Sequence, residues 1–196
     1  YSGSNRSGLK ETAQNAGKNL WMSEVDGAYT AGSNAGEMTA ALGLALRAQG
    51  AGFYVIIAQF LKSQPSGELK ALALLPHVTV LRSAREFGFT WTLSDEERMI
   101  LREDQEQLFR CAVSACPKEK RVLLVLDEVV SAQTYGYLAQ GRLEAYVSKL
   151  PENIEAVLTG RDPSAALVTM SDYVTEMKKI KHPFDRGVPA RDGIEF

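Results

Sequence analysis

The sequence predicts an α/β protein whose mainly parallel sheet carries helices on both faces. Short apolar runs alternate with helical stretches along the chain, which is the order expected of β-α-β units. Two of these runs, residues 53–60 and 122–126, are apolar at nearly every position, as in strands that are covered on both faces. A glycine-punctuated stretch, residues 32–39, leads directly into an alanine- and leucine-rich helical segment, an arrangement that presents free backbone N–H groups to an anion.

Size and charge restrict the class of protein further. A chain of 196 residues, 45% of them hydrophobic, can build one sizeable core, and neither an internal repeat nor a linker marks a second domain. We therefore expect an N-terminal arm over residues 1–20 and a single domain over residues 21–196. The net charge of -2 provides no basic field for nucleic acid, and no apolar run is long enough for a membrane span, so a soluble protein is expected.

The predicted strands cover residues 25–30, 53–60, 78–81, 122–126, 154–158 and 173–177. β-branched and large apolar residues dominate most of these runs. The first strand is weak, because Asp26 and Gly27 interrupt it. The run 122–126 is the clearest buried strand and stops at an acidic pair.

The predicted helices cover residues 9–18, 40–50, 68–75, 94–115, 143–150 and 162–171. Ser94 is a suitable N-cap for the long fourth helix, and the acidic residues at positions 95–97 complement the dipole of its first turn. Asp162 and Pro163 form an N-cap and first-turn pair for the last helix.

The two cysteines, Cys111 and Cys116, lie five positions apart on the long predicted helix. This spacing places them on different faces, so a disulfide or a metal pair is not expected. We expect two buried or half-buried free thiols in a reducing cytoplasm.

The stretch from Gly32 to Thr39 has the outline of a phosphate-binding loop. Its candidate nucleotide-binding residues are Gly32, Ser33, Asn34, Gly36, Glu37 and Thr39. However, Glu37 stands where such a loop carries its phosphate-binding Lys, and Met38 stands where a Ser or Thr would bind Mg²⁺. The shape of the loop is therefore retained while part of its chemistry is altered.

Two strand ends carry charged residues that could complete a phosphate site. Asp127 and Glu128 follow the run 122–126, and the carboxyl ends of parallel strands line the crevice in which such proteins hold a metal. Arg161 places a fixed cation at another strand end, suited to a phosphate or a carboxylate. Each residue also has an interpretation without a ligand. Asp127 would then be an ordinary acidic residue at a strand end, Glu128 would be solvated, and Arg161 would form an ion pair at the surface.

Phe89 and Trp91 lie in the segment 88–91, which follows the third predicted strand. Composition alone favours a satellite hydrophobic cluster, and a platform for a flat apolar ligand is the alternative. We expect His77 and His182 to be structural, because no second His or Cys is positioned to form a metal or nucleophile set with them.

Several short segments share a specific order and spacing with one enzyme family. They are residues 39–48, 59–62, 88–91, 126–128, 135–138, 158–161, 181–185 and 193–196. In these segments the chain resembles the ATP:corrinoid adenosyltransferases of the P-loop type, and the resemblance extends over nearly all of the chain beyond the first twenty-odd residues. It implies a P-loop NTPase or RecA-like fold.

The resemblance also implies a reaction and its participants. Cobalt(I) of cob(I)alamin or a related corrinoid attacks the 5′ carbon of the ATP ribose, and the whole triphosphate leaves. By similarity, the loop 32–39 and Arg161 would bind the nucleotide, and Glu128 with Asp127 would hold the accompanying Mg²⁺. Phe89 and Trp91 would be the catalytic aromatic residues, which lie against the lower face of the corrin, displace its axial base and leave a four-coordinate cobalt that is easier to reduce.

The family works as a homodimer in which an N-terminal helix closes over the active site, and residues 9–18 are the candidate for that helix. A flavoprotein is the implied reductant, and the cytoplasm is the implied location.

The loop departs from the family pattern, which reads Gly-Asn-Gly-Lys-Gly-Lys-Thr-Thr. Both lysines are absent, and an extra residue enters near Ala31. One charge about 5 Å from a phosphate interacts by roughly 3 kcal/mol at an effective dielectric of ~20, so exchanging Lys for Glu costs on the order of 6 kcal/mol per unit of phosphate charge before screening. That cost applies unless Glu37 points away from the phosphates.

Two interpretations follow from the altered loop. The chain is either an adenosyltransferase that is active despite it, or a catalytically impaired or inactive paralogue that binds corrinoid for delivery or regulation. A nucleotide-binding protein without a corrinoid role is disfavoured, because it would leave the segment 88–91 unexplained.

Overall fold

The computed structural model describes residues 20–26, 35–62, 66–83, 85, 92–189, 191 and 193–194, with the backbone alone for 20–26, 35–37 and 184. Its strands are β1 Leu20–Asp26, β2 Tyr54–Gln59, β3 Val78–Arg82, β4 Val122–Asp127, β5 Ile154–Gly160 and β6 Tyr173–Lys178. Its helices are α2 Ala35–Gly50, α3 Glu68–Leu72, α4 Asp95–Ser114, α5 Val129–Thr134, α6 Arg142–Val147 and α7 Ala165–Met170, followed by a 3-10 turn, η2 Pro183–Arg186.

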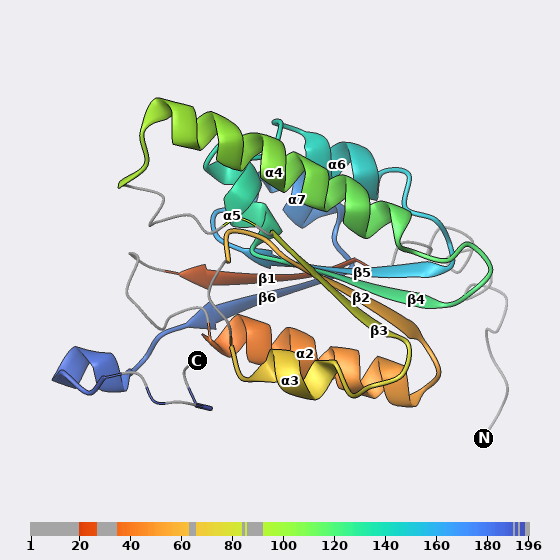
Figure 1. Ribbon diagram of the computed structural model, residues 1–196, viewed down its shortest axis with the longest axis horizontal. Coiled ribbons are helices and arrows are strands. Elements are labelled where there is room, and N and C mark those ends of the chain that lie inside the picture. Colours follow the sequence, from red (N-terminus) through yellow and green to blue (C-terminus); the bar gives the residue numbers. More distant parts are fainter. Residues whose placement is uncertain are drawn as a thin grey trace, which may run out of the picture.

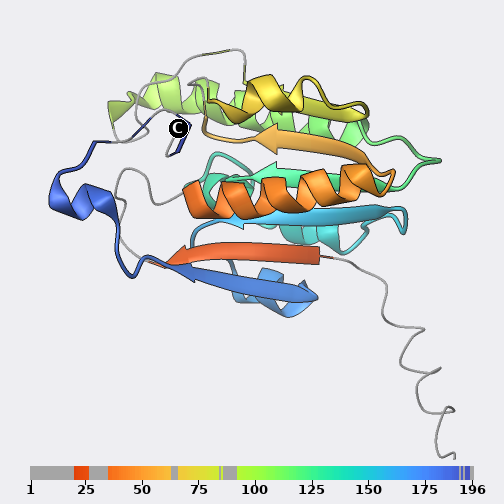
Figure 2. The ribbon, with the colours of Figure 1, turned by 90° about the horizontal axis from the view of Figure 1, so that it is seen from below.

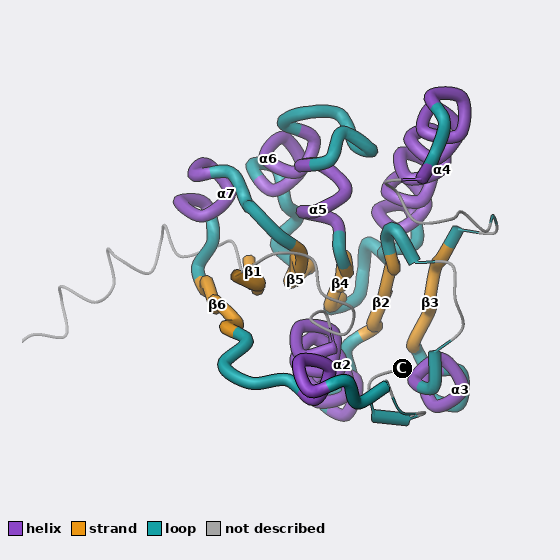
Figure 3. The backbone as a smooth tube through the Cα atoms, turned by 90° about the vertical axis from the view of Figure 1, so that its left-hand side faces the viewer, coloured by secondary structure: helices purple, strands orange, loops and turns teal. Residues whose placement is uncertain are grey.

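The six strands form one sheet in the order β3-β2-β4-β5-β1-β6, and every neighbouring pair is parallel. Helices α2 and α3 cover one face, and α4 to α7 cover the other (Figures 1 and 3). This arrangement confirms the predicted parallel α/β fold with helices on both faces. Strand β1 lies between β5 and β6, so its register partners come from the last part of the described chain: Leu20 is opposite Ala156, and Trp21 is opposite Tyr173.

Each face of the sheet has its own apolar core. Val55 and Ile57 of β2 pack toward α2 and α3, whereas Ile56 and Ala58 pack toward α4, because successive side chains of a strand point to opposite faces. Val125 of β4 belongs to the α2 side. Since all of these side chains are buried, the central strands contain almost no polar residues until they reach their carboxyl ends.

The carboxyl ends of the strands share one edge of the sheet with the first turn of α2. In Figure 2 the arrowheads and the start of α2 lie at the same side of the molecule, and α2 runs back across the sheet. It contacts β1, β2, β4 and β5 along its course. The amino-terminal end of α2 therefore points toward the edge where the strands finish.

The long helix α4 begins as predicted. Ser94 accepts a hydrogen bond from the backbone N–H of Glu97 at 3.3 Å, and the Glu97 carboxylate accepts one from the Ser94 N–H at 2.8 Å. This reciprocal capping box satisfies two backbone donors that would otherwise have no partner.

Three local predictions were wrong. The first strand begins at Leu20, five residues before the predicted start, because pairing with β5 and β6 on its two sides overrides the weak local propensity. Helix α7 is capped by Ser164, whose hydroxyl accepts from the Leu167 N–H at 3.1 Å, and Asp162 instead turns the chain with a φ of 53°. Cys111 is exposed rather than buried.

Cys116 is partly buried and free, as expected. Burial raises the pKa of its thiol to about 11, so it stays protonated at neutral pH. Within the described part of the chain, no helix combines the length and the apolar character needed to cross a membrane.

Gly160, the last residue of β5, adopts a φ of 138° that side-chain-bearing residues avoid. A Cβ at this position would lie 2.6 Å from the backbone nitrogen of Ser131 and 2.9 Å from its hydroxyl oxygen. The end of β5 and the first turns of α5 can therefore approach each other only if residue 160 is glycine.

We expect Gly160→Ala to lower the free energy of unfolding by more than about 2 kcal/mol, because it combines backbone strain with a backbone clash. Gly43→Ala is the matched control: Gly43 lies inside α2, and apart from its own helix backbone and chain neighbours no atom lies within 4 Å of the added Cβ. Urea titration should show the control at or above parental stability, since Ala in a helix interior is favoured over Gly by up to about 1 kcal/mol. Equal midpoints for the two variants would contradict this account.

Candidate functional site

A row of polar residues crosses the sheet where the strands end. Gln59 of β2 is opposite Asp127 of β4, and Thr159 of β5 is opposite Ser23 of β1. The residues two positions earlier on the same face, Ile57, Val125 and Val157, belong to the apolar core beneath α2. The change from apolar to polar at one level marks the edge of the sheet as the place for chemistry, as is usual in open parallel sheets.

Asp127 is the centre of this row. Its side chain is buried, and both of its carboxylate oxygens accept hydrogen bonds. The Thr159 hydroxyl donates to Oδ1 at 2.8 Å, and the ammonium group of Lys62 donates to Oδ2 at 2.5 Å. Asp127 is therefore paired with Lys62, and each of its carboxylate oxygens already accepts one hydrogen bond.

Glu128 starts α5 in the left-handed backbone conformation, with a φ of 61°. Its backbone N–H donates to the Thr159 hydroxyl oxygen at 2.8 Å, and its carboxylate accepts from the Ser131 hydroxyl at 2.8 Å. The Ser131 hydroxyl in turn accepts from the backbone N–H of Arg161 at 3.0 Å. These bonds tie the end of β4 to the end of β5 through two hydroxyl groups.

The electrostatics of Glu128 reflect this enclosure. Burial raises the pKa of the Glu128 carboxyl, and the neighbouring Asp127 carboxylate raises it further. The hydrogen bond from Ser131 and the positive charges of Lys62 and Arg161 oppose these effects without cancelling them. Glu128 is thus more easily protonated than an ordinary glutamate, and a nearby cation would favour its charged form.

Arg161 follows β5 directly and is 5% exposed. The sequence predicts Asp127, Glu128 and Arg161 as site residues, and the structure brings all three to the same edge of the sheet. Arg161 therefore belongs to a buried polar network at the strand ends, and the simple surface ion pair considered for it does not fit this burial.

The predicted loop is described from residue 35 onward. Gly36 and Glu37 lie in the first turn of α2, and Thr39 is exposed one residue after Met38. Met38 is buried in the apolar core on the α2 side, where its sulfur lies 4.0 Å from the Gln59 amide nitrogen. An acidic residue in a first turn complements the helix dipole, which is a structural reason for Glu37 that does not involve a ligand.

The remaining predicted residues fall outside the described part of the chain. Gly32, Ser33 and Asn34 of the loop and the aromatic residues Phe89 and Trp91 are in this group. The described flanks of the aromatic segment are the end of β3 and the N-cap of α4.

Gln59 and Glu68 form a second polar contact beside Met38. The Gln59 side-chain amide donates to Glu68 Oε1 at 3.3 Å, and the Ser66 hydroxyl donates to the same oxygen at 2.6 Å. Burial raises the pKa of Glu68, but hydrogen bonds from Ser66, from its own backbone N–H and from Gln59, together with the charge of Lys62, outweigh it and lower the pKa overall. The Gln59 Oε1 oxygen is fully buried and has no hydrogen-bond partner within the described residues.

A magnesium ion fits this edge only together with phosphate oxygens. The described residues contain no group of three or more His, Cys, Asp or Glu side chains that could hold a metal ion. Mg²⁺ commonly takes one or two protein carboxylates and completes its shell with phosphates and water. Glu128 can supply such a carboxylate, and the unpartnered Gln59 oxygen can accept a hydrogen bond from a water of such a shell.

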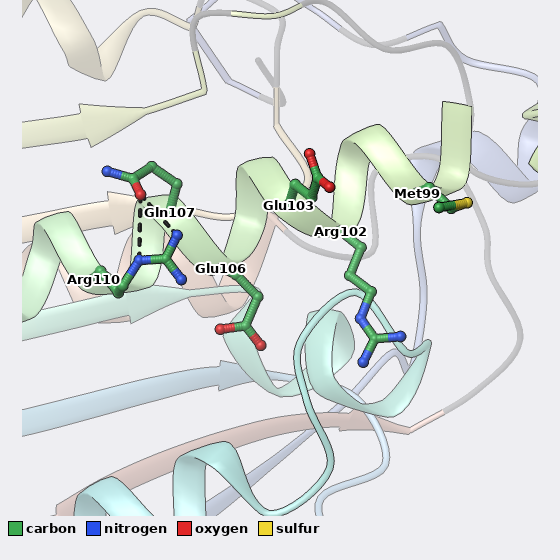
Figure 4. Close-up of a pocket in the computed structure, with 6 residues that line it drawn as sticks. All are labelled: Met99, Arg102, Glu103, Glu106, Gln107 and Arg110. Atoms are coloured by element: carbon green, nitrogen blue, oxygen red, sulfur yellow. Dashed lines mark hydrogen bonds between the residues drawn. The ribbon is translucent and has the colours of Figure 1, made fainter. Parts of the chain in front are cut away.

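A separate shallow cavity of about 650 Å³ follows the outer side of α4 (Figure 4). It is lined by Met99, Arg102, Glu103, Glu106, Gln107 and Arg110, all from this one helix. Its charged groups are partly engaged already: Arg110 donates to Gln107 at 2.7 Å, and Glu106 pairs with Arg142 at 2.9 Å. None of its lining residues belongs to the polar row, so we place the functional site at the strand ends.

Sequence reasoning assigned no role to Gln59, Lys62 or Thr159, which the structure adds to the site. The available signal was the position of these residues in the sequence. Gln59 is the first polar residue after the apolar run 53–58, and Thr159 directly follows the predicted strand 154–158. A polar residue at that position is buried at the carboxyl edge, where it needs a hydrogen-bond partner.

The raised pKa of Glu128 predicts an unusual stability effect. The folded state binds a proton that the unfolded chain releases, so the carboxylate costs stability once the pH rises above its ordinary pKa of 4.5. We expect Glu128→Gln to have a higher urea midpoint than the parent at pH 7, with the difference closing as the pH falls to 4.5 and below.

Glu68→Gln is the control, because we expect it to change the stability at pH 7 in the opposite direction. The pKa of Glu68 is lowered, so its charged form contributes stability above pH 4.5 that is lost as the pH falls. The Glu68 variant should therefore be less stable than the parent at pH 7. A Glu128→Gln variant that is also less stable at pH 7 would refute the burial argument.

Comparison with known proteins identifies the family. Residues 28–196 match the model of the ATP:corrinoid adenosyltransferase BtuR/CobO/CobP family. A corrinoid adenosyltransferase of Pseudomonas aeruginosa is 33% identical over 166 residues, which cover 84% of this chain and 80% of that protein. Corrinoid adenosyltransferases of Escherichia coli K12 and Salmonella typhimurium are each 30% identical, with 84% of this chain and 82% of theirs covered. The chain thus belongs to the ATP:corrinoid adenosyltransferase family.

Proposed function

We propose that this protein transfers the 5′-deoxyadenosyl group of ATP to the cobalt of a reduced corrinoid. The electron pair of cobalt(I) forms the cobalt–carbon bond, the bond from the 5′ carbon to oxygen breaks, and its electrons leave with the triphosphate. The observation that carries the proposal is the family match over residues 28–196, which includes the whole strand-end network of Asp127, Glu128 and Arg161.

The chemistry demands that negative charge on a leaving triphosphate be stabilised. Fixed cations and backbone dipoles do this best where water is partly excluded. At the strand ends the protein offers the amino-terminal end of α2 and the buried Arg161. We propose Glu128 as the carboxylate that holds Mg²⁺ against the phosphates; the ion, when bound, neutralises part of their charge.

The corrinoid requires an apolar wall, and we assign that role to Phe89 and Trp91. Lying against the lower face of the corrin, they would displace its axial base and favour four-coordinate cobalt. Membership in the family supports this assignment. The homodimer, the closing helix over residues 9–18, the flavoprotein reductant and the cytoplasmic location likewise stay predictions from the resemblance.

The altered loop gives the most direct test of activity. We expect the parent chain to adenosylate cob(I)alamin, and Glu37→Lys/Met38→Thr to bind MgATP more tightly in calorimetric titration, because it removes a repulsive charge and restores a hydroxyl. The matched control is Thr39→Ser, which keeps a hydroxyl one position further on.

Micromolar MgATP affinity in the parent, unchanged in the double variant, would contradict the importance of Glu37 and Met38. If adenosylation appears only in the double variant, the parent is the corrinoid-binding, non-catalytic relative. Activity in neither would reject the proposed reaction.

The aromatic platform has its own test. We expect Phe89→Ala and Trp91→Ala to reduce the shift of the cob(II)alamin visible spectrum toward the four-coordinate form, because the lower face would lose its aromatic cover. Tyr173→Ala serves as a control, since Tyr173 is an exposed aromatic residue on the edge strand β6. Spectra and corrinoid affinity that are unchanged in both variants would remove Phe89 and Trp91 from the site.

A further inference from the structure

Lys62 is a cation at the strand ends that has no role so far in binding the nucleotide or the corrinoid. It lies three residues after β2, and its ammonium nitrogen is 2.5 Å from Asp127 Oδ2. The side chain is 28% exposed, whereas that of Asp127 is 2% exposed. One side of the ammonium group therefore faces the buried carboxylate, and the other side is open to solvent or to a ligand.

The backbone before Lys62 is built into an unusual conformation. Leu61 has a φ of 53°, in the left-handed region that leucine rarely adopts. Its N–H donates to the side-chain oxygen of Gln105 on α4 at 2.9 Å, and Gln105 is 1% exposed. The preceding N–H, of Phe60, donates to the backbone oxygen of Asp127 at 2.9 Å. Two hydrogen bonds thus hold the turn that directs Lys62 back over the edge of the sheet.

Asp127 is fixed before it meets Lys62. Thr159 binds its other oxygen at 2.8 Å, so the carboxylate has one orientation and presents Oδ2 to the ammonium group. An ammonium group has three N–H donors, and Asp127 is its one partner within the described residues. Among the described residues, two donors of the ammonium group therefore remain for another anion.

The loop that leads into α2 has a shortage of positive charge. No Lys or Arg occurs between residues 19 and 46, and the loop itself contributes Glu37. A polyphosphate at the start of α2 therefore needs a cation from another segment. Gln59, three positions before Lys62, lies beside Met38 in the first turns of α2, so Lys62 follows a strand that ends next to that helix.

We propose that the Lys62 ammonium group binds the triphosphate of the nucleotide and replaces the cation that the loop lacks. Asp127 is its positioning residue. This inference rests on the proposed function, since it takes the polyphosphate as the ligand of this edge. A lysine suits this role because it acts on phosphate as a compact point charge.

The test uses inorganic triphosphate as the probe, titrated calorimetrically into the full chain, with ATP in parallel. We expect Lys62→Met to raise the Kd for triphosphate by roughly tenfold to a hundredfold, and Lys62→Arg to raise it less, because the charge is kept. Lys118→Met is the matched control, an exposed lysine in the connection that enters β4 from the opposite edge of the sheet.

A second variant separates binding from stability. Lys62→Met leaves the buried Asp127 without its ion-pair partner, which destabilises the fold whatever Lys62 binds. In Lys62→Met/Asp127→Asn both charges are removed, so we expect the urea midpoint to recover while the triphosphate affinity stays low. Recovery of both would show that Lys62 only neutralises Asp127 and would overturn the proposal.

The remaining outcomes distinguish this inference from the proposed function. A parent that adenosylates corrinoid while Lys62→Met binds triphosphate within twofold of it would overturn the role of Lys62 and keep the function. A parent that does not adenosylate but loses triphosphate affinity on Lys62→Met would keep the role of Lys62 and reject the function. No triphosphate binding by the parent up to millimolar concentration would overturn the role of Lys62.

Discussion

The hydroxyl group of Thr159 is the interaction on which the strand-end site depends. It donates to Asp127 Oδ1 and accepts from the N–H of Glu128, both at 2.8 Å. One hydroxyl group therefore fixes two successive acidic residues, the last residue of β4 and the N-cap of α5. Asp127 is oriented by it toward Lys62, and Glu128 is held in the left-handed conformation from which α5 begins. A residue at this position without both donor and acceptor capacity would release both.

The close approach of β5 and α5 completes this arrangement. Gly160 allows Ser131 to come within hydrogen-bond distance of both the Glu128 carboxylate and the Arg161 N–H. Several charged groups therefore lie buried at this edge of the sheet. In such surroundings of low dielectric constant their mutual interactions are strong and their burial is costly. The raised pKa of Glu128 reflects that cost, and the positive φ of Leu61 adds backbone strain at the same edge. Such local conflicts with stability are concentrated at functional sites.

Most of the fold followed from the sequence because its central strands are unambiguous. Strands β2 and β4 are apolar up to their last residue, and a strand of that kind needs helices on both faces. The position of β1 did not follow, because its pairing with β5 and β6 is set by residues far along the chain. Helix α5 was missed as well: it has six residues, and its N-cap, Glu128, forms no side-chain capping bond.

Only part of the site could be predicted, because some of its contacts also depend on which strands pair. Asp127, Glu128 and Arg161 carry charges at strand ends, which is a local signal. The part played by Lys62 depends on its contact with Asp127, and that contact requires β2 and β4 to be neighbours in the sheet. Local sequence patterns carry no information on which strands pair, so the partner of Lys62 became visible only in three dimensions.

The position of β1 also determines the order in which the molecule can be completed. Its register partners are Ala156 to Gly160 on one side and Tyr173 to Lys178 on the other. During synthesis β1 emerges before the other described strands, yet the strands that pair with it begin only at Ile154 and Tyr173. Strands β2, β3 and β4 can assemble earlier, because they are neighbours of one another. Strand β1 is therefore among the last of the described strands to be paired, and pairing between segments so far apart in the sequence slows folding.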